Sequence, residues 1–378
     1  MCKVKLGEVA IEHKETCKGN KDGYPIVGLE HLVPEEVTLT AWDEGSDNTF
    51  TKMFRKGNVL FGRRRAYLKK AAVAPFDGIC SGDITVIEAI PDRILPELLP
   101  FIIQNDELFD FAVGKSAGSL SPRVKWEHLK NYEFELPDMG KQRELAELLW
   151  AMDATKKSYQ KLIAATDELV KSQFMEQFGD GNYPLQSIGG MSDVVTKGTT
   201  PTTLGFEFVS AGVRFVKVEN ITATGQILKD ELMHVTQECH EKLSRSQLCE
   251  GDILFSIAGV IGRTAIVPAD ILPANTNQAL AIIRLKKGVD VLKTYLLAAL
   301  SSPYVESQYN DQKKGIAQIN LTLKNISDLQ IPIPSLAEQE RFAAFVRQSD
   351  KSKFAVLSCS NLNLWSSSFT PRNINLYL

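Results

Sequence analysis

The sequence is poor in the residues that build metal centres and disulfide frameworks. It holds six cysteines and five histidines in 378 residues, with neither a Cys-x-x-Cys pair nor a cluster of histidines. Scattered cysteines of this kind are typical of reduced thiols rather than zinc ligands. We therefore expect no metal site. The cysteines are Cys2, Cys17, Cys80, Cys239, Cys249 and Cys359.

Long apolar runs are also missing. The best candidate, Ile253 to Ile261, is stopped by Arg263 and is too short for a membrane span. No N-terminal stretch has the form of a signal peptide. With 44% hydrophobic and 24% charged residues, the composition is that of a globular protein, and the length predicts two or three domains. A cytoplasmic protein without membrane contact is expected.

The signatures of nucleotide hydrolysis and of DNA modification are absent. Gly114-Lys115-Ser116 resembles the end of a phosphate-binding loop, but Phe109 stands where that motif requires glycine. The Asn/Asp-Pro-Pro-aromatic tetrapeptide of amino-group DNA methyltransferases does not occur. Neither Pro-Asp pair is followed within roughly 30 residues by the acidic-x-Lys triplet of nucleases. We therefore expect a protein without a catalytic centre of its own.

Positive charge is concentrated in one segment, although the net charge of the chain is only −3. Residues 51–76 contain eight basic side chains and no acidic one. A solvated hairpin, which is the alternative interpretation, usually mixes both signs, so the block favours an anionic partner. The basic residues are Lys52, Arg55, Lys56, Arg63, Arg64, Arg65, Lys69 and Lys70.

The most informative feature is a long internal repeat. Gln142 and Gln339 are 197 positions apart, and each lies five residues after a proline. Upstream, Gly57-Asn58-Val59-Leu60-Phe61 matches Gly251-Asp252-Ile253-Leu254-Phe255 at an offset of 194. Solenoid repeats are far shorter than this. Two long copies instead predict two similar domains, each followed by the same connector.

The connector after each copy has helical periodicity. From Lys141, apolar residues recur at heptad spacing in two rows that continue to about Phe178, which predicts one helix of about 55 Å. A helix of that length needs a partner, and the segment from Gln339 is the candidate, with a frayed polar end. The first row is Leu145, Met152, Tyr159 and Thr166, and the second is Leu148, Thr155, Leu162 and Leu169.

Residues suited to DNA recognition occur in both halves. Arginine reads guanine through a bidentate contact, and asparagine or glutamine reads adenine in the same way. Small polar loops with lysine suit phosphate contacts. Turn capping by the amides and a plain connector role for the loops are the alternatives. The candidates are Arg63, Arg64, Arg65, Lys69, Lys115, Ser119, Arg123, Lys197, Thr199, Asn277, Gln278, Lys313, Lys314, Gln318 and Asn320.

Taken in order, these segments resemble the specificity subunits of type I DNA restriction-modification systems. The most specific segments are residues 196–201, 215–221, 251–255 and 320–341, and Gln142-Arg143 is the matching connector start of the first half. The resemblance covers essentially the whole chain. It implies an α+β fold with two similar target-recognition domains, each of mixed strands and short helices. It also implies two long helices that pair as an antiparallel coiled coil with approximate two-fold pseudo-symmetry.

The implied domains are residues 1–138 and 179–335, and the implied connector helices are residues 139–178 and 336–378. The implied function is non-catalytic reading of a bipartite site in double-stranded DNA, which directs adenine methylation or restriction. S-adenosylmethionine would belong to two modification subunits, and ATP with magnesium to restriction subunits, so no cofactor is expected in this chain. The alternatives are a self-contained restriction or modification enzyme and a coiled-coil adaptor that binds only proteins.

Overall fold

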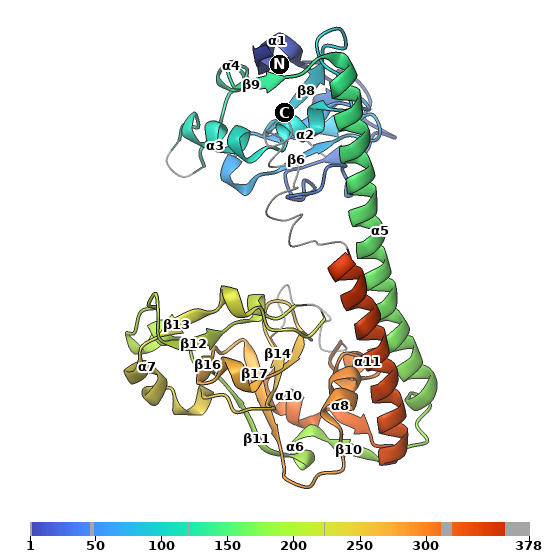
Figure 1. The fold of residues 1–378 in the computed structure, drawn as a ribbon, viewed down its shortest axis with the longest axis vertical. Coiled ribbons are helices and arrows are strands. Elements are labelled where there is room, and N and C mark those ends of the chain that lie inside the picture. The colour runs from blue at the N-terminus through green and yellow to red at the C-terminus, as the bar shows by residue number, and fades with distance from the viewer. Residues whose placement is uncertain (1, 46–48, 119–120, 223, 311–319, 360–378) are drawn as a thin grey trace. The chain divides into compact units, whose positions relative to one another are not determined.

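The computed structural model describes residues 2–45, 49–118, 121–222, 224–310 and 320–359. The chain divides into two compact units, one built on Met1–Gln160 and the other on Lys161–Val356 (Figure 1). Within the described residues, no helix is both long enough and apolar enough to cross a bilayer. Each unit contains one copy of the sequence repeat.

Each unit is built on a four-stranded antiparallel sheet, and the strand order is the same in both. The corresponding strands occupy corresponding places in the two sequence copies, so the repeated sequence folds twice into the same sheet. The order is β2 (Ala10–Glu12), β8 (Ile84–Ala89), β5 (Val59–Gly62) and β6 (Ala71–Val73) in the first unit, and β11 (Ser192–Lys197), β17 (Leu280–Leu285), β14 (Ile253–Ser256) and β15 (Thr264–Ile266) in the second.

The repeated Val-Leu-Phe or Ile-Leu-Phe segment forms a strand that is buried on both faces. In β5, Val59 and Phe61 pack into one apolar cluster, whereas Leu60 packs into another. In β14, Leu254 likewise belongs to a different cluster from its two apolar neighbours. Successive side chains of a strand point to opposite faces. A continuous apolar run therefore fits a sheet that is covered on both sides.

A small three-stranded sheet packs on one face, and here the two copies differ. In each unit two of its strands run parallel: β3 (Ile26–Val27) with β7 (Gly78–Cys80), and β12 (Val213–Val216) with β16 (Ala274–Thr276). The third strand adds beside β7 in the first unit but beside β12 in the second. These third strands are β4 (Lys52–Phe54) and β13 (Met233–Val235).

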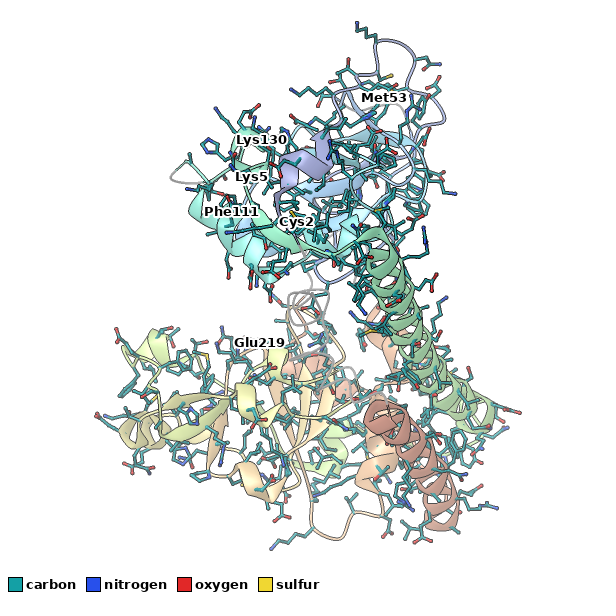
Figure 2. All side chains as sticks on the ribbon, turned by 45° about the horizontal axis from the view of Figure 1, so that its top comes forward. Cys2, Lys5, Met53, Phe111, Lys130 and Glu219 are labelled. Carbon is teal, nitrogen blue, oxygen red and sulfur yellow. The ribbon has the colours of Figure 1, made fainter. Side chains whose placement is uncertain are left out.

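Short helices and a two-stranded ribbon complete each unit; Figure 2 labels Cys2 and Lys5, the ends of the first ribbon strand. The first unit has α1 (Leu6–Val9), α2 (Leu99–Ile103), α3 (Asp106–Gly114), α4 (Trp126–Leu129) and the ribbon β1 (Cys2–Lys5) with β9 (Glu133–Leu136). The second has α6 (Ile188–Met191), α7 (Gln237–Lys242), α8 (Lys293–Leu300), α9 (Pro303–Asn310), α10 (Leu323–Asp328) and the ribbon β10 (Leu185–Ser187) with β18 (Gln330–Pro332).

Two long helices follow the two copies. α5 (Met139–Phe178) is one helix of 40 residues, and α11 (Leu336–Cys359) has 24. Within the second unit they pack antiparallel (Figure 1): Phe342 lies against Phe174, with ring centroids 5.7 Å apart, and Lys353 binds Asp167. The predicted pairing of the connector helices is confirmed there. The last dozen residues, which we expected to be frayed, lie outside the described residues.

Only one of the two predicted heptad rows of α5 is buried. In the first row Leu145 is 6% exposed and Met152 is half-buried. In the second row Leu148, Leu162 and Leu169 are 51%, 49% and 51% exposed among the described residues. The expectation that both rows are buried in a coiled coil is therefore wrong for the second row. In the first row, Leu145 and Met152 pack on the core of the first unit instead.

A buried glutamine near the start of each long helix makes the same hydrogen bonds twice. Gln142 is 2% exposed; its Nε2 donates to Pro137 O (2.9 Å), and its Oε1 accepts from Leu95 N (2.8 Å). Gln339 is fully buried; its Nε2 donates to the carbonyl of the proline five residues earlier (3.0 Å), and its Oε1 accepts from Leu292 N (2.9 Å). The repeat is therefore preserved at the level of individual hydrogen bonds.

Replacing either glutamine with alanine is expected to destabilise its own unit by about 1–3 kcal/mol, because the backbone N–H of half-buried Leu95 or Leu292 loses its acceptor and the buried carboxamide is removed. Urea unfolding of Gln142→Ala and Gln339→Ala measures this. The exposed neighbours supply the controls Arg143→Ala and Glu340→Ala, which should shift the midpoint very little. Equal shifts in the glutamine variants and their controls would contradict the assignment.

Candidate nucleic-acid interface

Three segments that are distant in the first copy meet at the end of β5. Arg63, directly after this strand, donates its backbone N–H to Asp83 O (3.0 Å), in the turn before β8. The carbonyl of Arg63 accepts from Val124 N (3.0 Å), at the end of the loop that follows α3. We call residues 63–65, 81–83 and 121–124 the first junction.

The same backbone frame recurs in the second unit. Ile257 donates its N–H to Ala279 O (2.8 Å) and accepts at its carbonyl from Leu321 N (2.9 Å). We call residues 257–258, 277–279 and 320–321 the second junction. The two junctions bring together most of the described residues that the sequence nominated for DNA recognition.

An equivalent turn precedes β8 and β17 in the two junctions. The Oγ of Ser81 accepts from Asp83 N at 3.2 Å, and the Oδ1 of Asn277 accepts from Ala279 N at 3.1 Å. These side chains mimic a backbone turn and fix the position of the residue two places on. The turn-capping role that we considered for Asn277 is therefore confirmed for its carboxamide oxygen.

In the first junction a carboxylate lies between two arginines. Arg123 donates through Nε and Nη2 to the two oxygens of Asp83, at 2.7 and 3.2 Å. Arg64 Nη1 lies 3.4 Å from Asp83 Oδ2, and Arg64 Nη2 donates to Ser121 Oγ at 3.1 Å. The hydrogen bond from Arg123, with the charges of both arginines, holds the pKa of Asp83 below its usual value although partial burial opposes this.

The first junction also contains unsatisfied donors. Among the described residues, the buried Nε atoms of Arg63 and Arg64 have no hydrogen-bond acceptor. Arg65 is exposed and adopts a left-handed conformation, with φ at 54°, which turns the chain sharply after the strand. The exposed ends of the Arg64 and Arg123 guanidinium groups offer donors to an acceptor-rich ligand.

The second junction presents amides and small side chains instead. The Oε1 of exposed Gln278 accepts from Thr200 Oγ1, which connects this turn to the segment after β11. That segment comes very close, since a Cβ on Gly198 would lie 1.9 Å from Thr276 O. Lys197 and Thr199 flank this glycine, exposed and half-buried respectively, and Asn320 is exposed at the loop end; all three are therefore placed beside or within the junction.

The remaining nominated residues lie elsewhere or outside the described residues. Lys69 Nζ donates to Asp106 Oδ1 at 2.6 Å, so its charge is already paired. Lys115 is exposed at the end of α3, with Nζ 5.8 Å from the ring centroid of Phe111, which Figure 2 labels. Ser119, Lys313, Lys314 and Gln318 lie outside the described residues.

Carboxylates from other parts of the chain neutralise much of the basic block at residues 51–76. Arg55 pairs with both Glu15 and Asp77, and Lys52 lies 3.6 Å from Glu12. These pairs, with those of Arg64 and Lys69, were missed because their acidic partners lie 19 to 40 positions away in the sequence. The block is therefore not a free cationic patch, and Asp83 is the functional candidate that sequence reasoning overlooked.

The segment Gly114 to Gly118 has the Gly-x-Ser-x-Gly spacing of a hydrolase nucleophile elbow. That elbow requires a strand before the serine and a helix after it. Here the helix α3 comes before it, and Ser116 Oγ donates to Ala112 O at 2.8 Å, as in a continuing helical turn. The local fold therefore does not support a nucleophile at Ser116.

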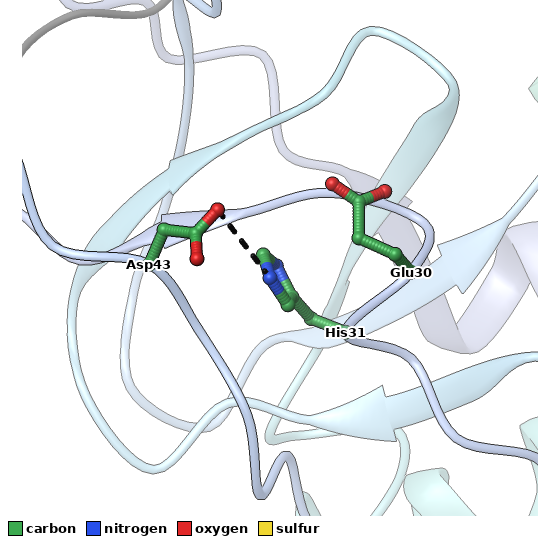
Figure 3. A group of neighbouring side chains, drawn as sticks. All are labelled: Glu30, His31 and Asp43. Atoms are coloured by element: carbon green, nitrogen blue, oxygen red, sulfur yellow. Dashed lines mark ion pairs between the residues drawn. The ribbon is translucent and has the colours of Figure 1, made fainter. Parts of the chain in front are cut away.

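Glu30, His31 and Asp43 place three potential metal ligands within 4.8 Å of one another (Figure 3). His31 Nδ1 accepts from Gly28 N at 2.9 Å, so the neutral ring carries its proton on Nε2. That nitrogen lies 3.6 Å from Asp43 Oδ2. A cation at Nε2 would require the other tautomer and the loss of the Gly28 bond, so the cluster is better explained as a loop-stabilising contact.

Comparison with known proteins supports the sequence resemblance. Residues 1–165 and 185–359 match the family described as type I restriction modification DNA specificity domain. The type I restriction enzyme EcoBI specificity subunit of Escherichia coli is 30% identical over 141 residues, which are 37% of this chain and only 29% of that subunit. The MjaVIII specificity subunit of Methanocaldococcus jannaschii is 22% identical over 345 residues, 86% of this chain and 75% of that one.

The fold has a counterpart among solved structures. A chain from a study of complex assembly and conformational transition of the type I R-M system superposes with a TM-score of 0.51 at 20% identity, covering 99% of this chain and 96% of that chain. The family match includes both copies of the repeated domain and the start of the connector after each. The chain therefore belongs to the type I restriction modification DNA specificity domain family.

Proposed function

We propose that the chain reads a bipartite site in double-stranded DNA, one domain to each half-site, and so directs adenine methylation or restriction by partner subunits. The recognition domains are residues 1–138 and 179–335, connected by helices at 139–178 and 336–378. The duplicated junction carries this proposal, because one backbone frame occurs twice with different side chains on it. Two such surfaces suit two different half-sites.

The chemistry of each junction fits contacts in the major groove. Arg64 and Arg123 offer guanidinium donors for guanine O6 and N7, and Gln278 and Asn320 offer amides for adenine N6 and N7. Lysines beside the junctions, such as Lys197, suit contacts with phosphates. Such contacts fix the position of the protein on the duplex but do not select the base sequence. The candidate contacts outside the described residues, Ser119, Lys313, Lys314 and Gln318, belong to the same proposal.

The proposal assigns the reaction to other chains. Two modification subunits would bring S-adenosylmethionine, and restriction subunits, where present, would bring ATP and magnesium; the assembly would work in the cytoplasm. The exposed row of Leu148, Leu162 and Leu169 on α5 supports protein partners, because leucines repeated along a helix and half exposed form an apolar surface suited to another helix.

The test is to map methylated adenines in cells that hold the modification subunits, with and without this chain. A single two-part motif that depends on the chain is the expected result. The variant Arg63→Ala/Arg64→Ala/Arg65→Ala should weaken DNA binding by about a hundredfold and relax one half of the motif only, because it removes base and phosphate donors from one junction. Lys3→Ala/Lys5→Ala/Lys130→Ala removes equal charge from the same unit and should leave the motif intact. Methylation independent of the chain would overturn the proposal.

A further inference from the structure

Asp83 makes the first junction unlike an ordinary anion-binding surface. Its carboxylate is 20% exposed and lies between guanidinium groups that are 39% (Arg64) and 42% (Arg123) exposed. A surface built only to attract phosphates gains nothing from a carboxylate at its centre, because the carboxylate cancels one of the two positive charges. The carboxylate therefore needs an explanation beyond charge.

The second unit shows that the fold does not require this carboxylate. The backbone bonds of Arg63, Asp83 and Val124 recur at Ile257, Ala279 and Leu321. In that frame the counterparts of the three charged residues are uncharged: Ala258 for Arg64, Ala279 for Asp83 and Asn320 for Arg123. Both arginines and the carboxylate are thus present together in one junction and absent together in the other. They behave as one functional unit rather than as a structural requirement of the turn.

We propose that Asp83 is a positioning residue that determines specificity in the first half-site: it orients Arg64 and Arg123 toward base edges and weakens their attraction to phosphates. The inference rests on the proposed function of the chain.

The geometry explains how one carboxylate has both effects. The two-bond contact with Arg123 fixes the plane of that guanidinium and engages two of its five N–H donors, which leaves the others for DNA. A fixed plane favours the bidentate guanine contact, whereas a freely rotating cation binds any phosphate. The carboxylate also lowers the combined charge of Arg64 and Arg123 from two to one, which reduces binding that does not depend on sequence.

The test compares Asp83→Asn with Asp77→Asn in the chain assembled with its modification subunits. Asp77 is a matched control, because it also pairs with an arginine, Arg55, in the same unit (2.9 Å), and its replacement removes the same charge. Binding is measured on duplexes that carry the methylated motif, on duplexes with one base changed in either half, and on unrelated DNA, each over a range of salt concentrations.

Asp83→Asn is expected to bind unrelated DNA about tenfold more tightly at low salt, with a salt dependence steeper by about one phosphate contact. Discrimination against base changes should fall about tenfold in one half-site and stay unchanged in the other. Asp77→Asn should match the natural chain in both respects. The same measurements are made on Asp83→Ala, because alanine is the residue at the equivalent position of the second junction, Ala279.

Three outcomes would overturn the inference. Identical salt dependence in Asp83→Asn and Asp77→Asn would show that Asp83 contributes only to the overall charge of the unit. Unfolding of both Asp83 variants would make it a stability residue. Loss of discrimination in both half-sites would place its effect outside the first junction. A natural chain that directs no two-part motif would instead overturn the proposed function itself, so the two failures are distinguishable.

Discussion

A four-residue helical insertion between Gln160 and Lys161 is expected to lengthen the gap between the two half-sites by one base pair, and at most two, without changing either half-site. α5 is a single helix through this point, so four residues add about 6 Å and rotate the following segment by about 40°. One base pair rotates DNA by roughly 35° and adds about 3.4 Å. The rotation favours one base pair, and the rise allows two. Methylation mapping measures the gap directly.

The matched control inserts four glycine and serine residues at the same place. Glycine weakens the helix, so this variant should lose a defined gap and methylate several spacings or none. A helical insertion that leaves the gap unchanged would show that the length of α5 does not set the distance between the half-sites. Such a result would leave the assignment of the junctions intact, because base reading and gap length are separate properties.

The duplication was predictable because residues that make the same hydrogen bonds in both copies are also the same residue type at the same spacing. A buried carboxamide that must satisfy the same proline carbonyl and the same loop N–H tolerates little change, so Gln142 and Gln339 kept their spacing. Gly57 and Gly251, each two residues before the start of β5 or β14, have positive φ of 89° and 78°. Such a conformation favours glycine at these two positions.

Other features depend on contacts that a local pattern does not contain. The three-stranded sheets use strands of two to four residues, too short for a periodic signal. Asn275 and Thr276 begin a run of four polar residues, yet both are fully buried in β16, where their side chains are hydrogen-bonded. Polar residues with satisfied partners can enter a core, and sequence alone does not reveal the partners.

The candidate site was predictable in part for the same reason. The arginines, amides and loops were nominated by type, and the fold brought the described ones largely into two equivalent junctions. Asp83 and Arg123 are 40 positions apart, so no local sequence pattern predicts that they interact. Heptad spacing also did not decide which row of α5 is buried, because two adjacent rows fit the pattern and only packing on the units selects one.

Phe174→Ala is expected to destabilise the second unit by about 3–5 kcal/mol, the largest effect of any single substitution considered for this chain. Phe174 is fully buried, and its ring centroid lies 5.3 Å from that of Phe178 and 5.7 Å from those of Tyr295 and Phe342. It thereby connects α5, α8 and α11. Truncation removes the buried ring with its edge-to-face contact to Phe342 and its tilted contacts to Phe178 and Tyr295. It leaves a cavity that these helices cannot close without moving.

Urea unfolding of the full chain measures this loss. Leu169→Ala, on the same helix but 51% exposed, should change stability by less than about 0.5 kcal/mol and serves as the control. A transition assigned to the first unit should not move in either variant, because Phe174 lies in the second unit. A loss below about 1 kcal/mol for Phe174→Ala would show that α11 is not held to α5 by this aromatic cluster. The pairing of the connector helices, and with it any spacer set by them, would then need another source of stability.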